Sequence, residues 1–303
     1  MANLKQIRTR IASVQSTGKI TKAMKMVATS KLQKAKDAVL ATRPYVSELI
    51  NVIEHLVVKT DASKHPLLRN PEEKKNVALI VISGDKGLCG AYNHNITKRA
   101  QKFVEEHIHT HDKIWLIFVG RKAYESMRKL DDPKVEKHLV EDGWSHSATE
   151  LGLKISKELC ARFEANEIDE AYVLYTVFKS AIAQNVVLDA VLPIQSIITN
   201  CDADGNSLLT EEEKANLDNT SYIYEPSNHE ILDLLLPRAV SIHVQRSLLE
   251  SLASENGARM TAMDNATNNA IELIGKLTLQ YNRARQSAIT NELIEVVSGA
   301  EAI

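Results

Sequence analysis

The sequence predicts an α+β/α/β chain in which both ends form one long antiparallel two-helix coiled coil and the middle forms an inserted α/β domain. Two observations lead to this prediction. Apolar and small residues recur about every 3.5 positions at both ends, whereas the middle contains short, continuous apolar runs. A long helix cannot bury its apolar stripe against a small domain, so the two ends are expected to pair with each other.

The first segment is predicted to form one helix over residues 3–57. It contains a single glycine, Gly18, and a single proline, Pro44. Its 3.5-residue spacing is typical of a coiled-coil seam, which is narrower than the stripe of a helix packed on a globular core. The predicted seam consists of Ile7, Ile11, Val14, Thr17, Thr21, Met24 and Ala28.

Residues 1–40 are strongly basic in a chain whose total charge is nearly balanced. The whole chain has 37 Lys and Arg against 39 Asp and Glu, but this segment has nine basic side chains and one acid, Asp37. It contains no aromatic residue, and its apolar face lacks bulky side chains, unlike helices that bind nucleic acid or lie on membranes. The charge therefore predicts an acidic protein partner and no nucleic acid. The alternative is a merely solvated face.

The middle, residues 76–226, is predicted to be a Rossmann-like α/β domain with a mixed sheet. The predicted strands cover residues 77–83, 113–119, 170–180 and 185–194. The predicted helices cover residues 91–109 and 145–165, with a third that starts at Arg121 and is followed by a polar loop. The last two strands are close enough in the chain to form a hairpin.

The last segment is predicted to return along the first helix. No proline interrupts residues 238–298, and the mean seam spacing is again about 3.5. The predicted seam consists of Met260, Met263, Thr267, Ala270, Ile274, Leu277, Tyr281, Ala284 and Ala288. The predicted domains are therefore a coiled-coil shaft from residues 1–60 and 227–303 and an α/β domain from residues 76–226.

A glycine-rich stretch, SGDKGLCGAYN at residues 83–93, follows the first predicted strand. Its glycines do not have the spacing of a P-loop or of a dinucleotide-binding turn. We therefore interpret it as a tight strand-to-helix turn and expect no nucleotide cofactor. A nucleotide-binding oxidoreductase built on the middle domain remains an alternative function at this point.

Catalytic and metal-binding patterns are scarce. Residues 202–213, DADGNSLLTEEE, imitate a calcium loop but have Ser207 where the sharp turn needs glycine. HIHTH at 107–111 is a weak metal-binding pattern. The three cysteines include no C-x-x-C pair, which favours a reducing compartment. The first residues lack the apolar core of a secretory signal.

Because the catalytic and metal-binding patterns are weak, the chain is not expected to be an enzyme by itself or to carry a metal.

Three stretches together resemble the gamma subunit of F-type ATP synthases. They are RIASVQSTGKITKAMKMVATSKLQKA (10–35), SGDKGLCGAYN (83–93) and the C-terminal ARMTAMDNATNNA…LTLQYNRARQSAITNELIEVVSGA (258–300). The resemblance implies a noncatalytic rotor shaft inside a ring of alternating alpha and beta subunits. It also implies that the α/β domain is a foot near the membrane ring and that the nucleotide sites belong to the partner subunits.

The resemblance implies two sets of contacts with the acidic lever loops of the beta subunits. Met24 and Lys25, in KAMKMV, and Arg259, in GARMTAM, match positions near those loops. Lys86 and Cys89 belong to the glycine-rich turn, which meets a lever loop lower down. A shaft that acidic loops press against is expected to be basic, as residues 1–40 are.

Further along, Arg285, Gln286 and Thr290, in ARQSAIT, match the contact that is known in the family as the catch. The apolar tip at 293–303 suits a bearing sleeve in which the shaft slides. The plastid type has a paired-cysteine insertion after the sheet. Here residues 197–220 contain only Cys201, so the thiol switch of that type is not expected.

The resemblance also implies partners and a location. The partners would be the alpha3beta3 hexamer, the epsilon subunit and the c-ring. The chain would then be peripheral, on the cytoplasmic face of a bacterial plasma membrane, although a processed chain on the mitochondrial matrix face would look similar. A free-standing coiled-coil adaptor that binds acidic proteins is the remaining alternative.

Overall fold

The computed structural model describes residues 2–59, 65–69, 71, 73–140, 148–180, 184–194, 225 and 227–301. In chain order the elements are α1 (Ala2–Lys59), η2 (Pro66–Leu68), β1 (Asn76–Ile82), α2 (Tyr92–His107), β2 (Lys113–Val119), α3 (Arg121–Met127), β3 (Val135–Val140), α4 (Ala148–Glu164), β4 (Glu170–Phe178), β5 (Gln184–Leu192) and α7 (Asn228–Glu301). Contacts divide the chain into two compact units, one of Met1–Ser30 with Arg259–Ile303 and one of Lys31–Ala258. Both α1 and α7 contribute residues to each unit.

The larger unit is built on a five-stranded mixed sheet with the strand order β3-β2-β1-β4-β5. The pairs β3–β2, β2–β1 and β1–β4 are parallel, and β5 runs antiparallel to β4. The central strand β1 is buried from Val77 to Ile82. A parallel strand covered on both faces needs apolar residues at every position, which explains its continuous apolar run.

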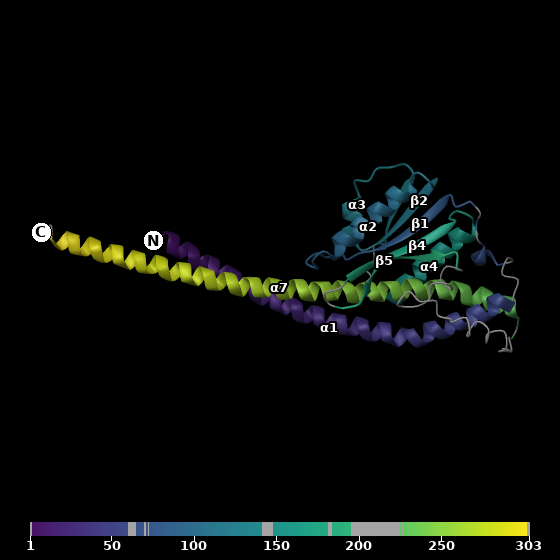
Figure 1. Cartoon of the computed structure of the whole chain (residues 1–303), viewed down its shortest axis with the longest axis horizontal. Helices are drawn as coiled ribbons and strands as arrows, with labels where there is room; N and C mark the ends of the chain where they lie inside the picture. Colours follow the sequence, from purple (N-terminus) through teal and green to yellow (C-terminus); the bar gives the residue numbers. More distant parts are fainter. Residues whose placement is uncertain are drawn as a thin grey trace. The chain divides into compact units, whose positions relative to one another are not determined.

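Helices cover both faces of this sheet (Figure 1). Leu79 and Val81 point toward α2 and α3, in a core that also contains Phe103 and Phe118. The residues of β1 that alternate with these two point to the opposite face of the sheet, toward η2, α4, α1 and α7. The second core contains Ala78, Ile80 and Ile82 of β1, Leu159 and Phe163 of α4, Ile53 of α1, and Leu236 and Val240 of α7. The two-residue periodicity of the strands thus separates two cores.

The sequence prediction missed one strand and part of one helix. Strand β3 was not predicted, because only its end residues Val135 and Val140 are buried, and an edge strand with a polar middle reads as a loop. Helix α7 starts at Asn228 and continues through Pro237, ten residues before the proline-free stretch used for its prediction. The calcium-like loop at 202–213 and Cys201 lie outside the described residues.

In the smaller unit, α1 and α7 pair antiparallel. Thr21 and Thr267 are joined by a 2.7 Å hydrogen bond between their hydroxyl groups, and Lys25 Nζ lies 2.6 Å from Asp264 Oδ1. A Cβ atom added to Gly18 would lie 3.5 Å from Ala270 Cβ. Residue numbers rise on one helix as they fall on the other, so the register is antiparallel, as predicted.

The seam of α1 differs from the prediction at one position. Thr17 is exposed, and its hydroxyl donates to Ser13 O at 3.1 Å. Gly18 lies in the seam instead, opposite Ala270 of α7. All nine predicted seam residues of α7 are buried or half-buried.

A polar cluster positions α7 against β4 and β5 in the larger unit. Tyr175 Oη donates to Asp189 Oδ2 at 2.8 Å, and Phe178 N donates to Glu250 Oε2 at 3.2 Å. His243 lies nearby on α7, and its buried Nε2 has no hydrogen-bond partner within the part of the chain that is described. Burial lowers the pKa of His243 to about 4, although Asp189 opposes the shift. The neutral ring is therefore the form that suits the fold.

Gly120 is predicted to be irreplaceable for stability. It has φ +93°, and an added Cβ would lie 2.0 Å from Ser83 O, where the ends of β1 and β2 meet. Gly120→Ala is expected to lower the free energy of unfolding by about 2–4 kcal/mol, measured by urea unfolding of the full chain. Gly275→Ala is the matched control. No atom lies within 4 Å of its added Cβ, and alanine in a helix should stabilise by about 0.5–1 kcal/mol.

His243 is predicted to make the fold sensitive to acid. Its pKa is lower in the folded state than its ordinary value of 6.5, so the folded state binds fewer protons than the unfolded chain. The contribution of the neutral His243 ring to the free energy of unfolding is therefore present above pH 6.5. It is lost as the pH falls toward 4, and the loss is at most about 3 kcal/mol. His243→Leu should flatten this part of the stability profile in urea unfolding between pH 4 and 7. The same change at the exposed His94 should leave the slope as it is.

Candidate partner-binding surface

The basic residues of α1 form an exposed surface. Eight of the nine Lys and Arg residues in 1–40 are exposed, and Lys25 is half-buried. The amphipathic spacing explains this, because apolar and small residues occupy the seam and leave the charged ones outside. Within Met1–Ser30 the exposed basic residues are Lys5, Arg8, Arg10, Lys19 and Lys22.

Met24, Lys25 and Arg259 all belong to the smaller unit, and all three are half-buried. Lys25 already has one carboxylate partner, Asp264, and their side chains are 40% and 45% exposed. Arg259 precedes Asp264 by five residues, or about 7.5 Å along the helix axis. The three predicted contact residues therefore lie on one stretch of the coiled coil, where a carboxylate already approaches Lys25.

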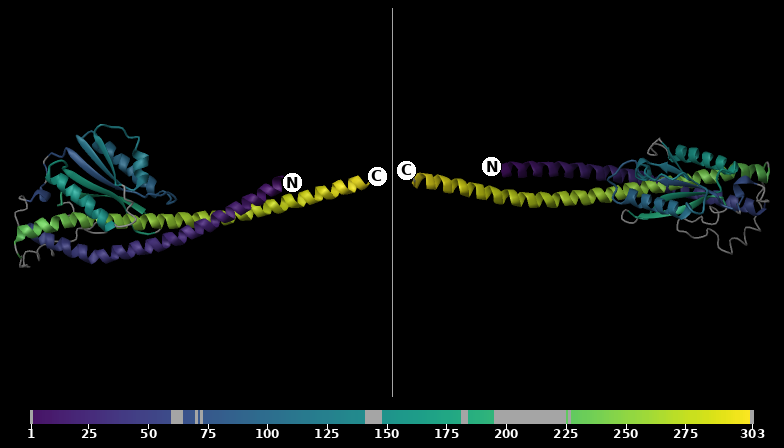
Figure 2. Two further views of the ribbon diagram at one scale, coloured as in Figure 1. Left: turned by 180° about the vertical axis from the view of Figure 1, so that it is seen from behind. Right: turned by 90° about the horizontal axis from the view of Figure 1, so that it is seen from above.

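Arg285, Gln286 and Thr290 are exposed on α7. The Thr290 hydroxyl donates to Gln286 O at 2.9 Å, a contact within one helical turn. The antiparallel register of Thr21 with Thr267 and of Gly18 with Ala270 puts Gln286 level with Ala2, the first residue of α1. Figure 2 shows that α7 extends beyond this end of α1. Ile289, next to Thr290, is also exposed, and the exposed apolar residues that follow are Leu293, Ile294, Val296 and Val297.

The glycine-rich turn is closed by its own hydrogen bonds. Gly84 N donates to Asn93 Oδ1 at 2.9 Å, and Arg121 N donates to Asp85 Oδ1 at 3.1 Å. The Glu255 carboxylate also lies close to Gly84, since its Oε1 would be 3.0 Å from an added Cβ. A phosphate site needs free backbone N–H groups, whereas here Gly84 N is bonded to a side chain, Ser83 N donates to Val119 O at 2.7 Å, and a carboxylate lies beside the turn. This geometry supports the interpretation as a turn.

Within this turn the structure separates the two predicted contact residues. Lys86 is exposed, but Cys89 is only 2% exposed, and its sulfur accepts from Asn93 Nδ2 at 3.2 Å. The exposed apolar residue is Leu88, which sequence reasoning did not select. A bulky apolar residue in the glycine-rich stretch KGLCG was the available signal.

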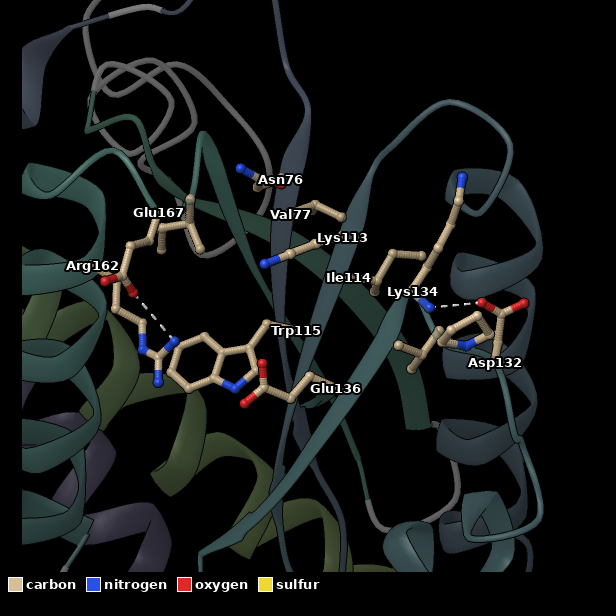
Figure 3. A pocket seen from close by; sticks show the side chains of 13 residues that line it. Asn76, Val77, Lys113, Ile114, Trp115, Asp132, Lys134, Glu136, Arg162 and Glu167 are labelled. Atoms are coloured by element: carbon tan, nitrogen blue, oxygen red, sulfur yellow. Dashed lines mark hydrogen bonds and ion pairs between the residues drawn. The ribbon is translucent and has the colours of Figure 1, made fainter.

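A pocket of about 560 Å³ lies at the end of the sheet away from the glycine-rich turn, where the parallel strands begin (Figure 3). It includes Asn76 and Lys113, the first residues of β1 and β2. The Arg162 guanidinium lies 3.9 Å from the centre of the Trp115 ring and forms an ion pair with Glu167 at 3.4 Å. Open α/β sheets bind dinucleotides at the carboxyl ends of their strands. This pocket lies at the amino ends and contains none of the predicted site residues.

The described residues contain neither a metal-binding cluster nor a membrane-spanning helix. No group of three or more His, Cys, Asp or Glu side chains there is arranged to hold a metal ion, and this covers His107, His109 and His111. The ring of His107 instead stacks on Phe103, with the ring centres 3.9 Å apart. No described helix is long and apolar enough to span a bilayer.

Known proteins match the whole chain. The family model described as ATP synthase matches residues 3–303. The ATP synthase gamma chain of Geobacter sp. (strain M21) is 42% identical over 303 residues, covering 100% of this chain and 99% of the relative. The gamma chain of Geobacter metallireducens is 44% identical over 305 residues with the same coverage.

Solved structures have the same fold. A chain of the Euglena gracilis mitochondrial ATP synthase, in an assembly of OSCP, F1 and c-ring, matches with a TM-score of 0.67 at 19% identity, covering 99% of this chain and 94% of its own. A chain of the central stalk and c-ring of the Tetrahymena thermophila enzyme matches with a TM-score of 0.58 at 22% identity, covering 82% and 99%. Given the full-length identity to curated relatives, the chain belongs to the ATP synthase gamma chain family.

Proposed function

We propose that the chain is the rotor shaft of the central stalk in an F1Fo ATP synthase. It would couple proton flow through the membrane ring to ATP synthesis or hydrolysis at the beta subunits, without performing chemistry itself. Its proposed partners are the alpha3beta3 hexamer, the epsilon subunit and the c-ring. Its proposed location is peripheral, on the cytoplasmic face of the bacterial plasma membrane.

The observation that carries this proposal is the exposed basic surface on a unit of two paired helices. A single helix bends and twists easily, whereas two helices joined along a seam resist torsion together. Five exposed basic side chains in residues 1–30 attract acidic loops and raise their rate of encounter. Contacts of this kind stay exchangeable, because exposed ion pairs are weak. A rotor needs such contacts since each one must break as the shaft turns.

The residue positions suggest two contact regions at different points along the coiled coil. Met24, Lys25 and Arg259 would meet the acidic lever loops along the coiled coil. Arg285, Gln286 and Thr290 would form the catch near the free end of α7, and their exposure supports this. The apolar residues beyond them suit a sleeve that grips by shape and forms few directional bonds.

A third contact is proposed at the glycine-rich turn. Lys86 is exposed and suits an acidic loop. Because the Cys89 side chain is buried, its contribution would be to hold the turn in shape. An oxidoreductase function is not favoured, since the backbone N–H groups of Ser83 and Gly84 in the turn are already bonded, and the described pocket at the amino ends of the strands holds no predicted site residue.

The first test of the proposal is reconstitution. The full chain, mixed with alpha and beta subunits of a related bacterial synthase, is expected to assemble into a complex whose ATP hydrolysis drives rotation. Rotation is measured with a bead attached to the foot domain. A chain that stays outside the alpha and beta ring would refute the proposed function.

The second test concerns the Lys25–Asp264 ion pair. Lys25 is half-exposed and shares its charge between Asp264 and any acidic partner. Lys25→Gln is expected to change the free energy of unfolding by less than about 1 kcal/mol but to weaken assembly with the alpha and beta subunits at low salt. Asp264→Asn releases Lys25 and should strengthen the same assembly.

The opposite signs of these two effects separate partner binding from stability. If the ion pair only supported the coiled coil, both variants would weaken assembly alike. Salt provides an internal control, because the Debye length falls to about 3 Å at 1 M and both effects should then shrink together. Lys19→Gln removes the same charge as Lys25→Gln from an exposed lysine of the same helix. It therefore serves as the control for the loss of one positive charge.

A further inference from the structure

Leu88 is unusual for a leucine in both its backbone conformation and its exposure to solvent. Its φ is +64° and the residue is 64% exposed. The left-handed region is strained for leucine and costs nothing for glycine. An exposed leucine also gains nothing from burial within its own chain. Folding alone would therefore favour glycine or a polar residue at this position.

The turn around Leu88 is held in this shape. Asn93 accepts from Gly84 N at 2.9 Å and donates to Lys86 O at 3.2 Å, and so bridges both sides of the turn. Asp85 accepts from Arg121 N at 3.1 Å, which joins the turn to the start of α3. A strained residue persists only where its surroundings impose the conformation. Here a side-chain network imposes it and presents an apolar side chain to solvent.

Basic and polar residues surround this position. Lys86 and Arg121 are exposed, and Lys122 N donates to Gly84 O at 3.1 Å, which places α3 directly beside the turn. A hollow of about 640 Å³ between α2 and α3 shares Asn93 with the turn. It is lined by Asn93, His94, Thr97, Lys98, Gln101, Lys122 and Ser126. No carboxylate lines this hollow, although Lys122 pairs with Glu125 nearby at 2.6 Å.

We propose that Leu88 is the apolar anchor of the contact made by this turn, and that the hollow between α2 and α3 receives the acidic flank of the same partner segment. The partner would be a loop or helix end with an exposed apolar side chain flanked by carboxylates. Leu88 would fill an apolar patch of that segment, while Lys86 and Lys98 would meet its carboxylates. This inference rests on the proposed function, in which the partner is an acidic loop of a beta subunit.

The test is competition for a limited amount of alpha3beta3 complex between tagged wild-type chain and each variant. Leu88→Ala and Leu88→Gly are each expected to lose by about fivefold or more, since buried apolar anchors dominate interfaces. Leu88→Met, which keeps an apolar side chain, should compete nearly as well as wild type. Lys98→Glu should lose at low salt and recover at high salt. Leu234→Ala, at a 73% exposed leucine of α7, is the matched control and should compete equally.

Stability separates this role from a structural one. Leu88→Gly should raise the unfolding midpoint by about 2 °C, because it removes strain, while it weakens assembly. Equal competition by Leu88→Ala and wild type would overturn the inference, as would a fall in the midpoint of Leu88→Gly. If wild type itself fails to enter the complex, the proposed function fails, and the assignment of Leu88 fails with it.

Discussion

The pairing of the two chain ends is the constraint on which the rest of this structure depends. Helices as long as α1 and α7 need a partner surface along their length, and in the smaller unit each provides it for the other. Their seam is built from small and polar residues such as Gly18, Thr21 and Ala270. Such a seam allows the helices to approach closely but buries little apolar area per turn. The helices must therefore pair over many turns to bury enough area for stability.

Electrostatics follow from the same arrangement. A coiled-coil seam buries one side of α1 and leaves its lysines and arginines outside, where only Asp37 is acidic among residues 1–40. The self-repulsion of these charges is tolerable in water and is relieved by an acidic partner. Lys25 illustrates the balance, because Asp264 on the opposite helix already supplies one such carboxylate. Basic charge and exchangeable pairing together suit a shaft that must release each contact it makes.

The sheet domain has a different function in this scheme, since it provides rigid support for one turn. Gly120 lets the ends of β1 and β2 approach, Asn93 closes the turn, and Leu88 is left strained and exposed. Strain of this kind is stable only on a well-packed support. The two cores on either face of the sheet provide that support, which links the packing of the sheet domain to the contact proposed at Leu88.

The sequence by itself determined the periodic features of this protein. Repeats of about 3.5 residues placed both long helices and every seam residue of α7, and apolar runs placed four of the five strands. Only the tertiary structure decided which side chains are covered. It put Gly18 in the seam in place of Thr17, revealed the edge strand Val135–Val140, and buried Cys89 while exposing Leu88. The physical reason is that periodicity is a local property, whereas burial depends on what packs against a residue from a distant part of the chain.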